Sequence, residues 1–360
     1  MEYFFMKKRI LLTGGSGAVG FEAFKELFRR RDDFDIRVFN LDQKRERKIF
    51  APYAPHIETI WGDLRNPQAV EEAVSGVDTI LHIAAVIPPA ADANPQLARE
   101  VNVEGTKNIL DAMSKQANPP RLVYTSSISV YGDRIKNPVI KVGDALNPSE
   151  GDAYARTKIE AEKLIRHSPF DWTIFRLSGI LYPKLKIQPL MFHMPLDTSL
   201  EFCHNSDTGF ALVTAIKSKN VWGRIFNLGG GKQCRTTARD FIRKMLTLFG
   251  VKPNALPEYA FATQNFHSGY YADGNLLNDI LDFQRHTLAD YYHTIQHNIS
   301  PAQRFLTRFI PAPFIKNWML HMSEPFKAVR ENNQALIKRF YGSRHIFENM
   351  FHKQERKIYR

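Results

Sequence analysis

The chain has 360 residues and a net charge of +12, with 44% hydrophobic and 24% charged residues. This length and composition are typical of a soluble globular protein with one large α/β domain and an appendage, or with two domains. Its two cysteines, Cys203 and Cys234, lack metal-ligand spacing, so we expect neither a disulfide framework nor a metal site. No apolar run reaches the ~18 residues of a membrane span, and residues 1–8 do not resemble a signal peptide. We therefore expect a cytoplasmic protein.

A glycine-rich stretch at 13–20 lies between an apolar run at 10–12 and a helical pattern at 21–31. A strand, a tight turn and a helix in this order present free backbone N–H groups to a pyrophosphate. Glycine is needed where a Cβ would block the phosphate or where φ is positive; a plain packing turn is the alternative interpretation. The predicted cofactor contacts here are Gly14, Ser16, Gly17, Ala18, Val19 and Gly20.

The next apolar run, 36–41, predicts a second strand, and Asp42 follows it. A carboxylate at this position accepts hydrogen bonds from an adenosine ribose and repels a 2′-phosphate, which favours NAD. The basic segment at 44–48, with Arg45 at its start, is suited to the extra phosphate of NADP. NAD is therefore the expected cofactor, and NADP is left open.

Residues 57–61 predict a third strand, with Asp63 and Leu64 placed near an adenine ring, and a helix follows at 67–74. A fourth strand at 79–85 contains His82, which we interpret as a packed, hydrogen-bonded histidine. The small residues that end this strand lie at the carboxyl edge, where open parallel sheets bind ligands. The cofactor contacts expected there are Ile83, Ala84 and Ala85.

Residues 102–108 open another helix, and 122–127 predict the next strand. Strands that alternate with helices in this rhythm predict a parallel sheet covered by helices on both faces. The expected fold class is therefore α/β, a doubly wound Rossmann sheet with a smaller C-terminal substrate domain and a basic helical tail.

Three residues carry the predicted chemistry. Ser127 ends a strand, and Tyr154 and Lys158 stand one turn apart on a helical segment at 152–167. A phenol ordinarily titrates near ~10, and we expect the lysine ammonium to lower that pKa toward neutral pH. Ser127 would hydrogen-bond the substrate oxygen while Tyr154 exchanges its proton.

Together these motifs resemble the extended branch of the short-chain dehydrogenase/reductase superfamily, the NAD-dependent epimerase/dehydratase group, over residues 7 to 300. The resemblance implies that Ser127, Tyr154 and Lys158 are catalytic and that Lys158 also binds the nicotinamide ribose. It further implies that Asn102 lies near the active site, that Asp63 lies near adenine, and that the chain forms a homodimer.

Departures from the family pattern narrow the expected reaction. Family dehydratases place an Asp-Glu pair after the catalytic hydroxyl residue, whereas this chain has Ile128 and Ser129, which disfavours dehydration. Many nucleotide-sugar members carry an Asn soon after an arginine like Arg176. This chain lacks that Asn, which weakens the case for a nucleotide-sugar substrate. The apolar residues at 190–196 either floor a pocket for a lipid-like or aromatic substrate or pack the small domain.

The C-terminal part adds a strand at 225–231, which we expect in the small domain, and a tail without counterpart in the resemblance. The tail, 301–360, holds twelve Lys and Arg against four Glu, and we expect one of its helices to begin at Pro325 and stop at Gly342. Apolar residues mixed with positive charge suit a membrane surface, and they equally suit packing on the protein itself; nucleic acid is not an expected partner.

The expected organisation is a dinucleotide-binding domain at 7–175, a mainly substrate-binding region at 176–300 that also supplies part of the core, and a basic amphipathic extension at 301–360. The predicted function is an NAD(P)-dependent oxidoreductase or epimerase that moves hydride at a secondary alcohol or ketone of a small molecule. Three alternatives stay open: a nucleotide-sugar epimerase, a membrane-associated sterol or lipid dehydrogenase, and a non-catalytic NAD(P)-binding scaffold.

Overall fold

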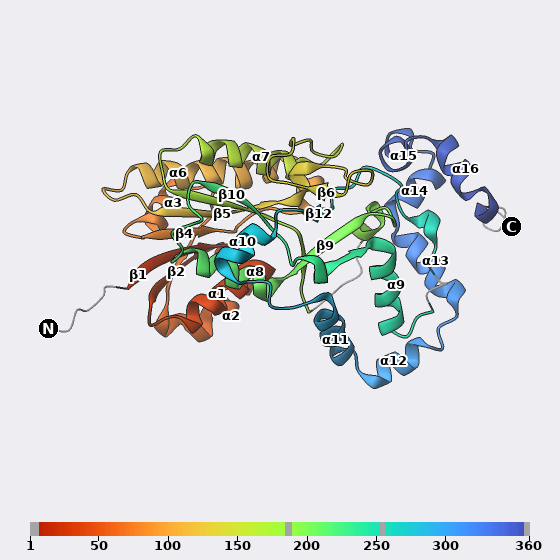
Figure 1. Ribbon diagram of the computed structural model, residues 1–360, viewed down its shortest axis with the longest axis horizontal. Coiled ribbons are helices and arrows are strands. Elements are labelled where there is room, and N and C mark those ends of the chain that lie inside the picture. Colours follow the sequence, from red (N-terminus) through yellow and green to blue (C-terminus); the bar gives the residue numbers. More distant parts are fainter. Residues whose placement is uncertain (1–6, 184–188, 253–255, 356–360) are drawn as a thin grey trace.

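A seven-stranded parallel sheet forms the centre of the computed structural model, which describes residues 7–183, 189–252 and 256–355 (Figure 1). The strand order is β10-β7-β5-β4-β1-β2-β3. The strands are β1 (Lys8–Thr13), β2 (Phe34–Asn40), β3 (Glu58–Trp61), β4 (Thr79–His82), β5 (Arg121–Ser127), β7 (Trp172–Leu177) and β10 (Arg224–Leu228). The order reverses at the neighbouring strands β1 and β4, the place where doubly wound sheets bind ligands.

Helices cover both faces of this sheet. One face carries α1 (Ala18–Arg29), α2 (Lys44–Phe50), α8 (Asn205–Ala215) and α10 (Asn275–Leu281). The other carries α3 (Pro67–Val74), α6 (Gly105–Ser114) and α7 (Ala153–Arg166), drawn above the sheet in Figure 1. Because both faces are covered, strands such as β1 are apolar at consecutive positions, and Ile10, Leu11 and Leu12 are all buried. The predicted doubly wound α/β fold is confirmed.

The last strand of the main sheet corrects the expectation for 225–231. β10 pairs in parallel with β7 at the edge of the seven-stranded sheet, and does not belong to the small sheets. The backbone N–H of Ser178 also donates to the carbonyl of Leu228 at 2.9 Å. A buried apolar strand has the same sequence pattern in either sheet, so the pattern did not identify its neighbour.

Two small sheets and a helical region adjoin the carboxyl side of the main sheet. The strands are β8 (Gly179–Leu181), β9 (Ser199–His204) and β11 (Arg235–Thr237) in one sheet, and β6 (Val139–Ile140) and β12 (Tyr270–Tyr271) in the other. The helices are α4 (Ala90–Ala93), α5 (Pro95–Arg99), α9 (Ala238–Leu248), α11 (Leu288–Asn298), α12 (Pro301–Thr307), α13 (Ala312–Met322), α14 (Glu324–Arg330), α15 (Gln334–Tyr341) and α16 (Arg344–Glu355).

The C-terminal helices gather at the end of the molecule away from β1, β2 and β3 (Figure 1). The single helix expected from Pro325 to Gly342 is divided into α14 and α15, because Asn332 between them takes a left-handed conformation with φ 54°. Inner residues of α14, α15 and α16 pack together on Tyr259 and Ala262, so these three helices share a core with the rest of the chain. No helix within the described ranges combines the length and the apolarity needed to cross a bilayer.

A buried ion pair joins α7 to the sheet. The guanidinium of Arg176 on β7 donates to both carboxylate oxygens of Glu162 at 2.9 and 2.6 Å, and also to the hydroxyl of Tyr131 at 2.7 Å. Both charged side chains are at most 2% exposed. The pair therefore fixes the helix that carries Tyr154 and Lys158 against the strand beside β5.

Glu162→Gln is expected to lower the free energy of unfolding by about 3 kcal/mol, because it leaves the buried Arg176 charge without its counter-ion. Glu160→Gln, two residues earlier, is the matched control: the Glu160 side chain is 43% exposed and pairs with Arg99 at the surface, so its loss should cost less than about 1 kcal/mol. Urea denaturation followed by circular dichroism measures both. Equal stability of the two variants would contradict the structural role of the pair.

Candidate active site

The glycine loop between β1 and α1 is built for close backbone approach. Gly14 has φ +71°, and a Cβ there would lie 2.6 Å from the backbone of Ala84, while a Cβ on Gly20 would lie 2.0 Å from the carbonyl oxygen of Gly14. Gly17 caps α1 without a side-chain hydrogen bond. The first N–H groups of α1 therefore have no side-chain cap and are available to an anion. These observations fit a dinucleotide pyrophosphate.

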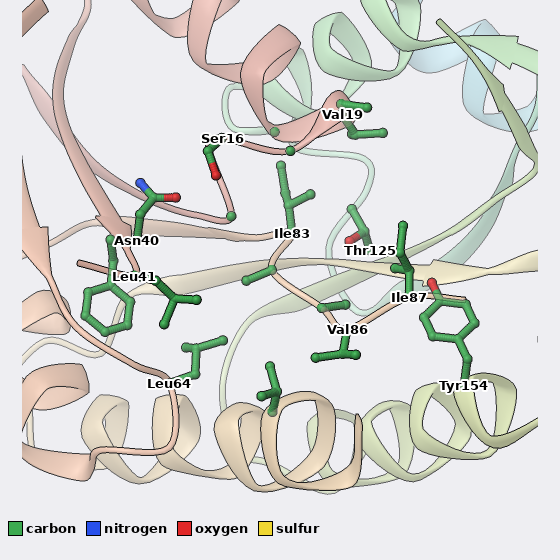
Figure 2. Close-up of a pocket in the computed structure, with 18 of the residues that line it drawn as sticks. Ser16, Val19, Asn40, Leu41, Leu64, Ile83, Val86, Ile87, Thr125 and Tyr154 are labelled. Atoms are coloured by element: carbon green, nitrogen blue, oxygen red, sulfur yellow. The ribbon is translucent and has the colours of Figure 1, made fainter. Parts of the chain in front are cut away.

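A cavity of about 700 Å³ opens at the carboxyl ends of β1, β4 and β5. Figure 2 shows the glycine loop on one side, the segment after β4 across the middle, and Tyr154 rising from α7 at the end opposite Asn40. A cavity of this size accommodates a cofactor-sized ligand.

The structure brings most of the predicted site residues to this one cavity. The lining includes the three predicted catalytic residues and most of the predicted cofactor contacts: Gly14, Ser16, Gly17, Ala18, Val19, Gly20, Asp63, Leu64, Ile83, Ala84, Ala85, Ser127, Tyr154 and Lys158. Two predicted contacts, Asp42 and Asn102, are not part of it. Residues distant in sequence therefore meet at the predicted edge of the sheet, while their individual roles stay predictions.

Asp42 faces away from the cavity. Its carboxylate accepts from the Arg47 guanidinium at 2.5 and 2.9 Å, and this pair lowers the pKa of Asp42. Arg47 in turn lies over the ring of Trp61, 4.9 Å from its centroid. Strand β2 ends at Asn40, one residue before the predicted end at residue 41, so Asp42 is the second residue beyond the strand.

Two polar residues that the sequence analysis did not select, Asn40 and Glu46, line the cavity near Ser16. Both are 6% exposed, and Glu46 Oε1 accepts from Arg45 at 3.0 Å and from the Ser16 hydroxyl at 3.5 Å. Asn40 Nδ2 and Glu46 Oε2 are buried without hydrogen-bond partners among the described residues. The available sequence signal was a single acidic residue, Glu46, within the basic segment 44–48. The basic residues on both sides of it concealed that signal.

Asn102 lies behind the cavity wall rather than in it. Its Nδ2 donates to the Val86 carbonyl and to the Thr157 hydroxyl, both at 3.0 Å, and its Oδ1 accepts from the Val86 N–H at 2.7 Å. Since Val86 lines the cavity and Thr157 belongs to α7, Asn102 ties the segment after β4 to the helix that carries Tyr154. The geometry therefore gives it a positioning contact.

Lys158 is enclosed beneath the cavity. It is 2% exposed, its Nζ donates to the Thr125 carbonyl at 2.8 Å, and it lies 4.6 Å from the Tyr124 ring centroid and 5.7 Å from that of Tyr154. Burial lowers the pKa of Lys158 to about 7, although the Glu162 carboxylate opposes this change. A substantial fraction of Lys158 is therefore neutral at physiological pH.

The pKa of Tyr154 changes in the direction opposite to the sequence-based expectation. Burial raises the pKa of the phenol, and its hydrogen bond with the Ser127 hydroxyl opposes that change. Lys158 does not compensate, because its own charge is weakened by burial. In the protein by itself, the phenol of Tyr154 is therefore protonated at neutral pH, with the Ser127 hydroxyl beside it. Ser126 also lines the cavity, but the contact to the phenol favours Ser127.

Two other expectations have clear outcomes. His82 is fully packed, with Nδ1 2.8 Å from the Thr13 hydroxyl and Nε2 3.1 Å from the Thr106 hydroxyl, and burial lowers its pKa to about 3. It is therefore a neutral structural histidine, as predicted.

Of the apolar residues at 190–196, Phe192 and Leu196 are buried against α9 and α13 and do not line the cavity, so the packing interpretation is correct for them.

Comparison with protein families agrees with the geometry. Residues 11–174 match the model of the 3-beta hydroxysteroid dehydrogenase/isomerase family. A 3-beta-hydroxysteroid dehydrogenase from Mycolicibacterium neoaurum is 38% identical over 169 residues, 44% of this chain and 42% of the relative. An N-acetyl-alpha-D-glucosaminyl-diphospho-ditrans,octacis-undecaprenol 4-epimerase from Escherichia coli O157:H7 is 34% identical over 163 residues, 45% of this chain and 44% of the relative. The chain spans about half the length of the curated relatives it matches.

Solved structures share the fold at low sequence identity. A dTDP-glucose 4,6-dehydratase from Streptomyces venezuelae, with NAD bound, has a TM-score of 0.67 at 22% identity and covers 80% of this chain and 96% of its own. A short-chain dehydrogenase/reductase superfamily protein from Agrobacterium tumefaciens, also with bound NAD, has a TM-score of 0.60 at 21% identity and covers 82% and 99%.

The fold and the cavity define a Rossmann-type protein with a Ser, Tyr and Lys set beside a glycine loop. The family match and the relatives agree with this class: residues 11–174, somewhat less than half of the chain, are similar to a family of the extended short-chain dehydrogenase/reductase superfamily. The resemblance drawn from the sequence motifs is confirmed.

Lys158 makes stability depend on pH. Its pKa is near 7 in the folded protein and near ~10.4 in an unfolded chain, so between these values the unfolded state binds more protons and the free energy of unfolding rises with pH. Lys158 should add about 1 kcal/mol per pH unit between about pH 7.5 and 9.5. Urea denaturation across this range should show a smaller slope for Lys158→Met. Lys163→Met, an exposed lysine on the same helix, should keep the slope of the natural protein; the same slope in all three proteins would contradict the burial effect.

Proposed function

We propose that this protein is an NAD(P)-dependent oxidoreductase or epimerase that transfers hydride at a secondary alcohol or ketone. The observation that carries the proposal is the convergence of Ser127, Tyr154 and Lys158 on the cavity that also contains the glycine loop. Similarity to known proteins supports it, since relatives named as a dehydrogenase and an epimerase match a little under half of the chain. When bound, a nicotinamide dinucleotide supplies the hydride acceptor or donor.

The side chains of this protein provide the proton chemistry. Ser127 holds the substrate oxygen, and Tyr154 gives or accepts the proton on that oxygen. Lys158 is held near Tyr154 by its hydrogen bond to the Thr125 carbonyl. In this buried environment, a positive charge on Lys158 has a large effect on the pKa of the Tyr154 phenol. Because its own pKa is near 7, Lys158 can take up or release a proton during this exchange.

NAD is the cofactor we favour over NADP. The cavity corner lined by Ser16, Asn40 and Glu46 is suited to an adenosine ribose, whose hydroxyls can pair with the amide and the carboxylate. Arg45, the residue that kept NADP open, is bonded to Glu46 and to the Ser16 carbonyl. The buried carboxylate of Glu46 opposes a 2′-phosphate at this position.

The substrate class that fits best is an apolar alicyclic alcohol or ketone. The cavity that holds Tyr154 is also lined by Val86, Ile87, Leu177, Ile180 and Tyr182. Among the described lining residues only Arg65, which is paired with Asp63, and Lys158 carry basic groups, so the described wall offers little to a sugar diphosphate. This wall and the matching family model favour a sterol-like or lipid-like substrate over a nucleotide sugar.

The intact reactive set argues against a non-catalytic scaffold. A homodimer, a membrane-peripheral location, and a division into regions 7–175, 176–300 and 301–360 are further proposals. The dimer is supported by the resemblance to the superfamily, and the peripheral location by the excess positive charge of 301–360.

Tyr154→Phe should reduce kcat by about 10²- to 10⁴-fold, because it removes the proton donor while keeping the ring. Dinucleotide affinity should stay nearly unchanged. Assays with hydroxysteroids and alicyclic alcohols, together with fluorescence titration of NADH, measure the two quantities. Tyr53→Phe, a packed tyrosine outside the cavity, is the control for loss of a phenol; undiminished turnover in Tyr154→Phe would overturn the proposed enzyme.

Glu46→Gln should narrow the preference for NAD over NADP by about tenfold, equivalent to about 1.4 kcal/mol, because it removes the charge that opposes the 2′-phosphate. Asp42→Asn is the matched control: Asp42 is an exposed carboxylate already paired with Arg47, and its loss should leave the ratio unchanged. Calorimetric titration with both cofactors gives the ratio. If the Asp42 variant changes it and the Glu46 variant does not, Asp42 is the ribose contact.

A further inference from the structure

The C-terminal extension has two different surfaces. Helices α14, α15 and α16 bury Val329, Ile337, Phe340 and Phe347 in a shared core with Tyr259. Helices α12 and α13 instead leave large apolar side chains in solvent. We call the latter the α12–α13 patch: Phe305, Leu306, Phe309, Ile310, Phe314 and Trp318, which are between 45% and 71% exposed.

This patch is unlike the rest of the described surface. Twelve large apolar residues are exposed within the described ranges, and six of them fall between residues 305 and 318. These six include every exposed Phe and Trp among them. Isolated exposed apolar residues are ordinary, whereas a contiguous group marks an interaction surface.

Helix α13 has two apolar faces, about 100° apart around its axis. Ile315 and Met319 face the core beside Phe192 and Leu246, while Phe314 and Trp318, one turn apart, face outward. An amphipathic helix normally buries its apolar residues and leaves its polar ones in solvent. Packing against the protein covers only one side of α13.

The position of the patch is fixed by the fold. The Thr307 hydroxyl donates to the Phe249 carbonyl at the end of α9, and the rings of Phe305 and Phe309 meet edge to face at 4.9 Å. Helix α12 lies at an outer corner of the molecule (Figure 1). The apolar side chains are therefore presented together at a protruding edge.

The charge around the patch indicates its partner. Residues 291–323 contain three Lys or Arg and no Asp or Glu, although the chain as a whole has 37 acidic residues. Among these, Arg308 is exposed on the same segment as the apolar side chains. Bulky apolar side chains with an exposed Trp, on a segment that carries basic residues and no acidic ones, suit the headgroup region of an anionic bilayer.

We propose that the α12–α13 patch docks the protein on an anionic lipid surface, with Phe309, Phe314 and Trp318 entering the interface and the nearby cations contacting the headgroups. The protein then lies on the membrane without crossing it. This inference is independent of the cofactor and of the reaction.

Sedimentation with sucrose-loaded vesicles tests the proposal on the full chain. The natural protein should pellet with vesicles of phosphatidylcholine and phosphatidylglycerol, and binding should weaken in vesicles of phosphatidylcholine alone and at high salt. Replacing Phe309, Phe314 and Trp318 by Ser should lower the partition coefficient at least about tenfold, since each residue loses interfacial apolar contact. The three side chains are exposed, so the fold should be preserved, which circular dichroism and thermal denaturation check.

The matched control replaces Leu276, Ile346 and Met350 by Ser, three residues exposed to a similar degree outside the patch, and should bind vesicles like the natural protein. Absence of binding by the natural protein, or equal binding by the two triple variants, would overturn the proposal. If light scattering shows that the patch variant loses a dimer while vesicles never bind the natural protein, the patch is a subunit contact instead. NADH titration of the patch variant should be unchanged, which separates failure here from failure of the proposed function.

Discussion

The enclosure of Lys158 is the constraint on which the active-site arrangement depends. Its Nζ is held by the Thr125 carbonyl at 2.8 Å, under the same strand end that supplies Ser127. Burial brings Lys158 close to Tyr154 and also lowers the pKa of Lys158 to about 7. The same enclosure therefore places the lysine beside the phenol and weakens the positive charge that would act on it. The protein keeps Lys158 in place through backbone geometry and through the ion pair that anchors α7, rather than through a counter-ion at the ammonium itself.

The motif-based part of the site was predictable because it depends on backbone geometry. Gly14 and Gly20 are required by close contacts, and the i, i+4 spacing of Tyr154 and Lys158 places them together on one helix. The parallel sheet followed from the alternation of apolar strands and helices, although β7 was not predicted and β10 was expected in the small domain. These features are local, and the handedness of parallel crossovers then brings them to one edge.

Features that depend on an exact strand end or on a distant partner were not predictable. Asp42 and Asn40 are two positions apart, and the point where β2 stops determines which one faces the cavity. Glu46 became visible only when α2 placed it beside Ser16. The raised pKa of Tyr154 reflects burial, which spacing alone does not report. The exposed face of α13 likewise emerged only after its other face was found to be covered.

Strand β10 has a consequence for how such a protein changes over evolutionary time. It completes the edge of the cofactor-side sheet, although it lies in the chain between β9 and β11 of a small sheet. Leu277, Leu281 and Phe283 pack in the same core, although they follow the last strand of the small sheets. The main sheet and the small sheets are thus interleaved along the chain. A cut near residue 175 would separate one face of the main sheet from helices that bury it. New substrate preferences must therefore arise by remodelling of internal loops, because exchange of a terminal module would dismantle the cofactor-side core.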